Sequence, residues 1–144
     1  MNMRMTIITL FFMSMIALQF PCNAQDNPAQ TNNEEVKSSD LGVYYFHFER
    51  RCNTCISVEN NSKKALEELY PEPVKSGEYF FKSVNLDEAA GKEIGEKMGI
   101  GMQTLIVVHG DKKVDITGEG FMYVDNYERL KAEVKKAVEK ALKE

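Results

Sequence analysis

Cysteine is scarce in this chain. Its 144 residues include three cysteines, and of these only Cys52 and Cys55 lie outside the apolar N-terminal segment. A disulfide-stabilised scaffold would need more pairs at longer spacings, so that class is excluded. A single pair that closes so short a loop adds little chain-entropy stabilisation. A role in reactivity therefore fits Cys52 and Cys55 better than a role in stability.

Clustered positive charge is also missing. The chain has 18 Lys and Arg against 22 Asp and Glu, for a formal net charge of −4, and its basic residues are spread along the sequence. This distribution argues against a nucleic-acid partner. Beyond the N-terminal segment, no apolar run is long enough to cross a bilayer. The sequence shows no internal repeat, and the stretch from Leu41 is long enough for one hydrophobic core.

The N-terminal segment has the pattern of a secretory signal peptide. Arg4 precedes an apolar stretch from Met5 to Phe20, and Pro21 ends this stretch before Cys22-Asn23-Ala24. We therefore expect residues 1–24 to be removed on export to the periplasm. Two alternatives stay open. The segment could be a membrane anchor, or Cys22 could be lipidated as the new N-terminus, although Pro21 does not suit a lipoprotein signal.

The rest of the chain predicts a spacer followed by one α/β domain. Residues 25–40 are polar and acidic, which is typical of a flexible spacer, and the domain is expected over residues 41–144. Helical connections predict that the first three strands run parallel, and the turn at Gly110-Asp111 makes the last pair antiparallel. This is a four-stranded mixed sheet with helices on both faces, in the order βαβαββα. The first expected elements are a strand (Val43–Phe48), a helix (Asn53–Tyr70) and a second strand (Tyr79–Asn85). The next helix is expected to be capped by Asp87, to end near Met98 and to bury Ala90, Ile94 and Met98. Two strands follow (Thr104–His109 and Lys113–Thr117), Gly118 and Gly120 break the second of them, and the last helix is Val124–Leu142.

The motif Cys52-Asn53-Thr54-Cys55 stands where a buried strand turns into a helix. Free N–H groups and the helix dipole at this end favour a thiolate on Cys52, and Arg50 and Arg51 add positive charge. Cys55 lies one turn further in, at the head of the apolar helix face, and is close enough to form a disulfide with Cys52. We expect Cys52 to be the nucleophile and Cys55 the resolving thiol.

Several motifs together resemble the thioredoxin-like superfamily. They are Cys52-Asn53-Thr54-Cys55, Val84-Asn85-Leu86-Asp87, and Lys97-Met98-Gly99-Ile100 before Thr104-Leu105-Ile106-Val107-Val108. More narrowly, Phe46-His47-Phe48-x-Arg50-Arg51-Cys52-x-Thr54-Cys55 resembles exported bacterial proteins labelled nitrophenyl compound nitroreductase subunit, the ArsF family. The resemblance implies a thioredoxin-like fold and an exported thiol–disulfide oxidoreductase that needs no cofactor. We infer no nitroreduction from the label.

Three positions depart from the thioredoxin pattern. Arg51 takes the place of the tryptophan before the first cysteine, Phe46 that of the buried acid, and Gln103 that of the cis-proline. Without proline a cis peptide bond costs about 2.5–4 kcal/mol, so we expect a trans bond at Gln103. The resemblance places Gln103 and Thr104 against the cysteines, where their amide, hydroxyl and backbone groups could bind a substrate chain or tune the thiols. General protein disulfide reduction is correspondingly less expected.

Two other functions stay open at this stage. The dithiol could bind a soft metal or metalloid ion, with His47 as a candidate further ligand, although a histidine in a buried strand is more often satisfied within the core. The protein could also be an adaptor with an inert disulfide. For the redox function, the expected partners are a thiol or disulfide protein or small molecule, and a membrane-linked redox partner that resets the pair.

Overall fold

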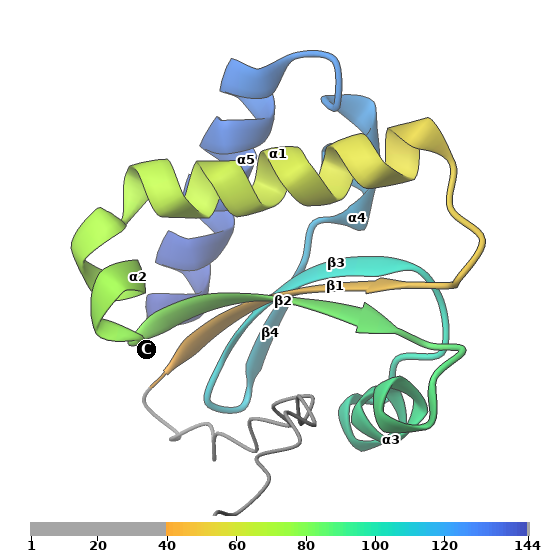
Figure 1. Cartoon of the computed structure of the whole chain (residues 1–144). Coiled ribbons are helices and arrows are strands. Elements are labelled where there is room, and N and C mark those ends of the chain that lie inside the picture. Colours follow the sequence, from red (N-terminus) through yellow and green to blue (C-terminus); the bar gives the residue numbers. More distant parts are fainter. Residues whose placement is uncertain (1–39, 144) are drawn as a thin grey trace, which may run out of the picture. The chain divides into compact units, whose positions relative to one another are not determined.

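Strands and helices follow one another along residues 40–143, the part of the chain that this computed structural model describes (Figure 1). The predicted signal peptide and, except for Asp40, the predicted spacer lie outside these residues. The elements are β1 (Leu41–His47), α1 (Asn53–Leu69), α2 (Pro71–Ser76), β2 (Tyr79–Asn85), α3 (Ala89–Met98), β3 (Thr104–His109), β4 (Lys112–Asp115), α4 (Thr117–Met122) and α5 (Tyr127–Leu142). Within this part of the chain, every helix is too short or too polar to span a membrane.

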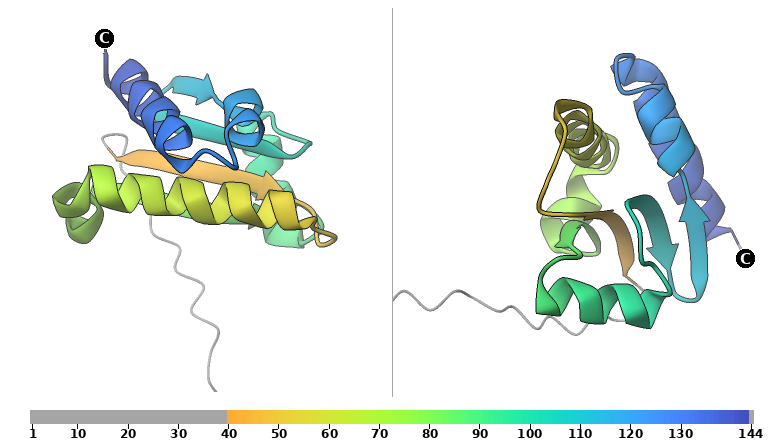
Figure 2. Two further views of the ribbon diagram at one scale, coloured as in Figure 1. Left: turned by 90° about the horizontal axis from the view of Figure 1, so that it is seen from above. Right: turned by 90° about the vertical axis from the view of Figure 1, so that its right-hand side faces the viewer.

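The four strands form a mixed sheet in the order β2-β1-β3-β4. β1 pairs with β2 in parallel, whereas β3 runs antiparallel to both β1 and β4. The expected parallel direction of β3 is therefore wrong. The helix α3 is ten residues long and lies across the strands instead of along them, as Figures 1 and 2 show. Because α3 does not carry the chain back along the sheet, β3 begins at the same end of the sheet at which β2 ends. β3 therefore runs antiparallel to β1 and β2.

The antiparallel pairing decides which residues lie together at this end of the strands. Phe46, near the end of β1, is opposite Thr104, the first residue of β3. The loop before β3 therefore lies next to the loop that follows β1. A parallel β3 would have placed these two loops at opposite ends of the sheet.

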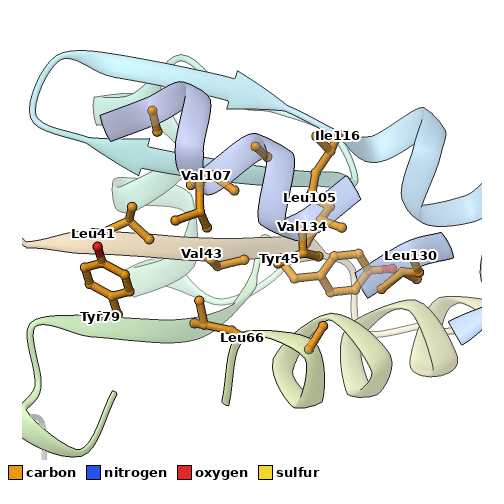
Figure 3. Packing of buried hydrophobic residues seen from close by; sticks show 14 of the residues in the cluster. Leu41, Val43, Tyr45, Leu66, Tyr79, Leu105, Val107, Ile116, Leu130 and Val134 are labelled. Atoms are coloured by element: carbon orange, nitrogen blue, oxygen red, sulfur yellow. The ribbon is translucent and has the colours of Figure 1, made fainter. Parts of the chain in front are cut away.

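Helices cover both faces of the sheet, as the sequence predicted. Alternate residues of β1, among them Val43 and Tyr45, join the larger core under α1 and α5 (Figure 3). Tyr44 and Phe46 point to the other face and pack with Ile94 and other partners beneath α3. Six of the seven residues of β1 are buried, because β1 is a central strand covered on both sides.

Each of the two long helices buries one apolar stripe against the sheet. Val58, Ser62, Ala65 and Leu66 are buried on α1, which runs unbroken from Asn53 to Leu69. The buried residues of α5 are Leu130, Val134, Ala137, Val138 and Ala141. The side chain of Asn61 donates a hydrogen bond to the Val124 carbonyl at 3.1 Å and so ties α1 to the segment before α5.

Two short helices were not predicted, so the observed order is βααβαββαα. Pro71 occupies the first turn of α2, where its missing N–H costs nothing. Asp115 ends β4 and its carboxylate accepts hydrogen bonds from the N–H and hydroxyl of Thr117 at 2.8 and 2.6 Å. This local bonding starts α4 in the segment that was expected to be a break followed by the last helix.

The start of α3 also differs from the prediction. The helix begins at Ala89 with Glu88 before it, and Asp87 does not cap it. The Asp87 carboxylate accepts the backbone N–H of Glu49 at 2.7 Å instead, linking the loop after β2 to the loop after β1. Ala90 is exposed, and Gly91 is the residue that faces inward.

Candidate active site

A disulfide joins Cys52 and Cys55 at the beginning of α1, with 5.1 Å between their Cα atoms. Cys52 is the N-cap residue of this helix, and its Sγ accepts the backbone N–H of Cys55 at 3.1 Å. The Cys52 carbonyl accepts the N–H of Ile56, also at 3.1 Å. The predicted position of the motif at a helix N-terminus is therefore confirmed.

The two sulfur-bearing residues differ in their access to solvent. Cys52 is exposed, whereas Cys55 is half-buried and begins the inward face that continues through Val58. A thiolate on Cys52 would accept the same Cys55 N–H as a charge-assisted hydrogen bond and would also lie at the positive end of the helix dipole. Geometry and electrostatics thus agree with a reactive Cys52, and the assignment of roles stays a prediction.

Gln103 lies against the disulfide from the far side of the site. Its Oε1 is 4.0 Å from Cys55 Sγ, and its Nε2 donates to the hydroxyl of Tyr45. The antiparallel β3 places it there, because Thr104 pairs with Phe46. No peptide bond among residues 40–143 is cis, which confirms the trans bond expected at Gln103.

Thr104, the other residue expected here, has a different environment. It is buried, and its hydroxyl donates to the Met102 carbonyl at 3.0 Å. That hydroxyl therefore bonds the adjoining loop, and within residues 40–143 no hydrogen bond joins it to either cysteine. A substrate-binding role for Thr104 rests on its backbone and stays a prediction.

The two arginines before the motif behave differently. Arg50 is exposed and forms no ion pair within the described part of the chain. Arg51 is half-buried, where its guanidinium pairs with the Glu59 carboxylate and lies 5.6 Å from the centre of the Tyr45 ring. The charge of Arg51 is therefore partly compensated, while that of Arg50 acts through solvent. Tuning of the Cys52 thiol by either arginine stays a prediction.

Tyr45 connects Gln103 to this ion pair. Its side chain is buried in the larger core, and burial raises the pKa of its hydroxyl, against the opposing effects of the Gln103 hydrogen bond and the Arg51 charge. The phenol therefore stays neutral at ordinary pH. Its hydroxyl links the larger core to Gln103 beside the disulfide.

His47 is not available as a metal ligand in this structure. Its Nδ1 donates to the Phe48 carbonyl at 2.9 Å, so its Nε2 accepts from the Ser83 hydroxyl, also at 2.9 Å. Both ring nitrogens are thus satisfied, at the half-buried end of β1. Among residues 40–143 no group of three His, Cys, Asp or Glu side chains is arranged to hold a metal ion.

Three apolar side chains are exposed on the segments that meet at the disulfide. Phe48 follows β1, Ile56 lies in the first turn of α1, and Met102 precedes β3, with 41%, 41% and 70% of their surfaces exposed. Each is close in sequence to a site residue. We refer to these three exposed residues, Phe48, Ile56 and Met102, as the apolar rim.

Two residues of the site, Tyr45 and Glu59, were not predicted from the sequence. Signals for both were present, because alternation along β1 places Tyr45 on the side of α1, and Glu59 follows Cys55 by four residues on the same helix. Only the fold joins them, through Arg51 and Gln103.

The strand order, the strand directions and a Cys-x-x-Cys disulfide at the N-terminus of the helix after β1 define a thioredoxin-like fold. Solved structures similar to the chain include thioredoxin O2 from Arabidopsis thaliana in its oxidized state and the thioredoxin of Fasciola hepatica. Each is 22% identical; the matches cover 68% and 69% of this chain and 75% and 82% of those chains, with TM-scores of 0.48 and 0.45. No family model and no curated protein matches the chain.

Proposed function

We propose that this protein is a thiol–disulfide oxidoreductase that uses Cys52 and Cys55. The observation that supports this most is the exposed position of Cys52 at the helix N-cap, where its Sγ accepts the Cys55 N–H and is bonded to the half-buried Cys55. A structural disulfide gains nothing from such exposure, whereas an exchanging one requires it.

The exchange proceeds in two steps. In the reducing direction, the Cys52 thiolate attacks one sulfur of a partner disulfide and forms a mixed disulfide, and the other partner sulfur leaves as a thiolate that takes up a proton. Cys55 then loses its proton to solvent and attacks Cys52 Sγ. The second partner sulfur leaves and is protonated, so two electrons pass from the dithiol to the partner. The oxidising direction is the reverse.

The apolar rim supports a protein partner. Phe48, Ile56 and Met102 would lose exposed apolar surface to a partner chain that brings a cysteine or disulfide to Cys52. The loop at Gln103 lacks the proline that ordinary thioredoxins have at this position. This difference supports a narrower range of partners than that of a general protein disulfide reductase. Resetting of the pair by a membrane-linked redox partner belongs to the same proposal.

The stoichiometry of exchange tests this function. The reduced protein mixed with a small-molecule disulfide such as 5,5′-dithiobis(2-nitrobenzoate) is expected to release two aryl thiols per chain and to regain the Cys52–Cys55 disulfide. Absorbance counts the released thiols, and peptide mass spectrometry locates the bond. Release of two thiols with two separate adducts and no internal disulfide would contradict a redox pair. Zinc or arsenite held stoichiometrically by the reduced protein, with no turnover, would support the metal-binding alternative.

Export of the protein is a further part of the proposal. It rests on the apolar run from Met5 to Phe20 and on Cys22-Asn23-Ala24, which lie outside the described residues. The mature protein is expected to begin near Gln25 and to carry no lipid, and mass spectrometry of the N-terminal peptide measures this. An acylated Cys22 would instead identify a lipid-anchored protein.

The proposed relationship to the ArsF family depends only on the residues from Phe46 to Cys55. We propose it as a relationship of sequence, and no flavin or nitro compound enters the function proposed for the site.

A further inference from the structure

The Gln103 side chain is held at its amide nitrogen and faces the disulfide with its amide oxygen. Its Nε2 donates to the Tyr45 hydroxyl, and its Oε1 faces Cys55 Sγ at 4.0 Å. Tyr45 is itself fixed by the core around its ring and by the Arg51 guanidinium 5.6 Å from the ring centre. The half-buried ion pair between Arg51 and Glu59 fixes that guanidinium in turn. A carbonyl oxygen therefore faces the more protected of the two sulfurs.

This contact changes character with the redox state. In the disulfide, Cys55 Sγ has no proton and offers no hydrogen bond to Oε1. After reduction, the Cys55 thiol carries a proton that Oε1 can accept. A hydrogen bond to the neutral thiol raises its pKa, and the negative end of the carbonyl dipole disfavours the thiolate for the same reason.

We propose that Gln103, oriented by Tyr45, is a positioning residue that keeps the reduced Cys55 thiol protonated and so delays the second step of exchange. The inference rests on the proposed function for its effect on exchange, although the hydrogen bond itself does not. Cys55 must lose its proton before it attacks Cys52 Sγ. Stabilising the protonated thiol therefore lengthens the life of the mixed disulfide on Cys52, so that a bound partner stays attached for longer.

The acidity of Cys55 tests the hydrogen bond without any turnover. In the Cys52→Ser protein, alkylation of Cys55 by iodoacetamide is followed as a function of pH. We expect Gln103→Ala to lower the midpoint of this profile and to raise the alkylation rate at pH 7 about fivefold, from the usual strength of one such hydrogen bond. Gln103→Glu is expected to shift the midpoint the opposite way, because a carboxylate beside the sulfur disfavours its thiolate.

Tyr45→Phe tests the orienting role. The substitution keeps the buried ring and removes the hydroxyl, so the amide of Gln103 is free to rotate and the midpoint is expected to fall as in Gln103→Ala. Because Tyr45 acts through Gln103, the double variant should show no further fall. The matched control is Tyr44→Phe, the same change on the adjacent residue of β1, which points to the other face and is expected to leave the profile unchanged.

Three results would overturn the inference. The first is an unchanged profile in Gln103→Ala, and the second is a midpoint that rises, which would mean that the amide N–H faces the sulfur. The third is a double variant whose midpoint falls further than that of Gln103→Ala alone. With both cysteines present, Gln103→Ala should shorten the lifetime of a glutathione mixed disulfide on Cys52, and an unchanged lifetime would overturn the effect on exchange. If the pH profiles shift as expected but the wild-type protein reduces no disulfide, the proposed function fails and the hydrogen bond stands.

Discussion

Replacing Cys52 by serine is expected to abolish thiol–disulfide exchange, while Cys55→Ser should accumulate stable mixed disulfides. Cys52 is the exposed cysteine at the helix N-cap, so its replacement removes the proposed nucleophile. Without Cys55, no thiol remains to displace the partner from Cys52. Incubation of each reduced variant with oxidised glutathione, followed by intact-mass spectrometry, measures both results. One glutathione per chain is expected on the Cys55→Ser variant.

Thr54→Ser provides the matched control, since it introduces a serine into the same exposed turn and keeps both sulfurs. Its exchange rate should stay within about twofold of the wild-type rate, as for an ordinary surface substitution. The opposite assignment would follow if Cys55 were alkylated first in the reduced wild-type protein at mildly acidic pH. Equal alkylation of both cysteines would favour a chelating pair over a redox pair.

Gly91→Ala is expected to cause the largest loss of stability among simple substitutions in α3. A Cβ atom at this position would lie 1.8 Å from the Asn85 carbonyl oxygen, and Gly91 is buried. The helix would have to move away from the end of β2, which costs about 3 kcal/mol and outweighs the roughly 1 kcal/mol by which alanine favours a helix. Thermal unfolding followed by circular dichroism should show a Tm lower by more than about 10 °C.

Gly101→Ala is the control for this substitution. It adds the same methyl group in the loop between α3 and β3, and its Cβ would meet nothing within 4 Å. Its stability should stay within about 0.5 kcal/mol of the wild-type value. If Gly91→Ala destabilises the protein no more than Gly101→Ala, the close approach of α3 to β2 is not a constraint on the fold.

The sequence by itself determined the elements whose signals are local. Unbroken apolar runs identified β1 and β3, and three- and four-residue steps identified the buried faces of α1 and α5. The position of Cys52 at a helix N-terminus also followed, because the motif lies between a strand and a helix that are each recognisable from their own residues. Even so, the short α2 and α4 were missed, since a helix of six residues has too few turns to show a period.

Tertiary structure alone decided which segments meet. The helical connection suggested a parallel β3, but α3 is short, lies across the sheet and packs through Gly91 where Ala90 was expected, so β3 returns antiparallel. That return brings Gln103 to Cys55 and to Tyr45. The ion pair of Arg51 with Glu59 likewise depends on how the turn before α1 folds over the helix. Such contacts join residues far apart in the chain, and their positions follow from the packing of whole elements, which no local pattern encodes.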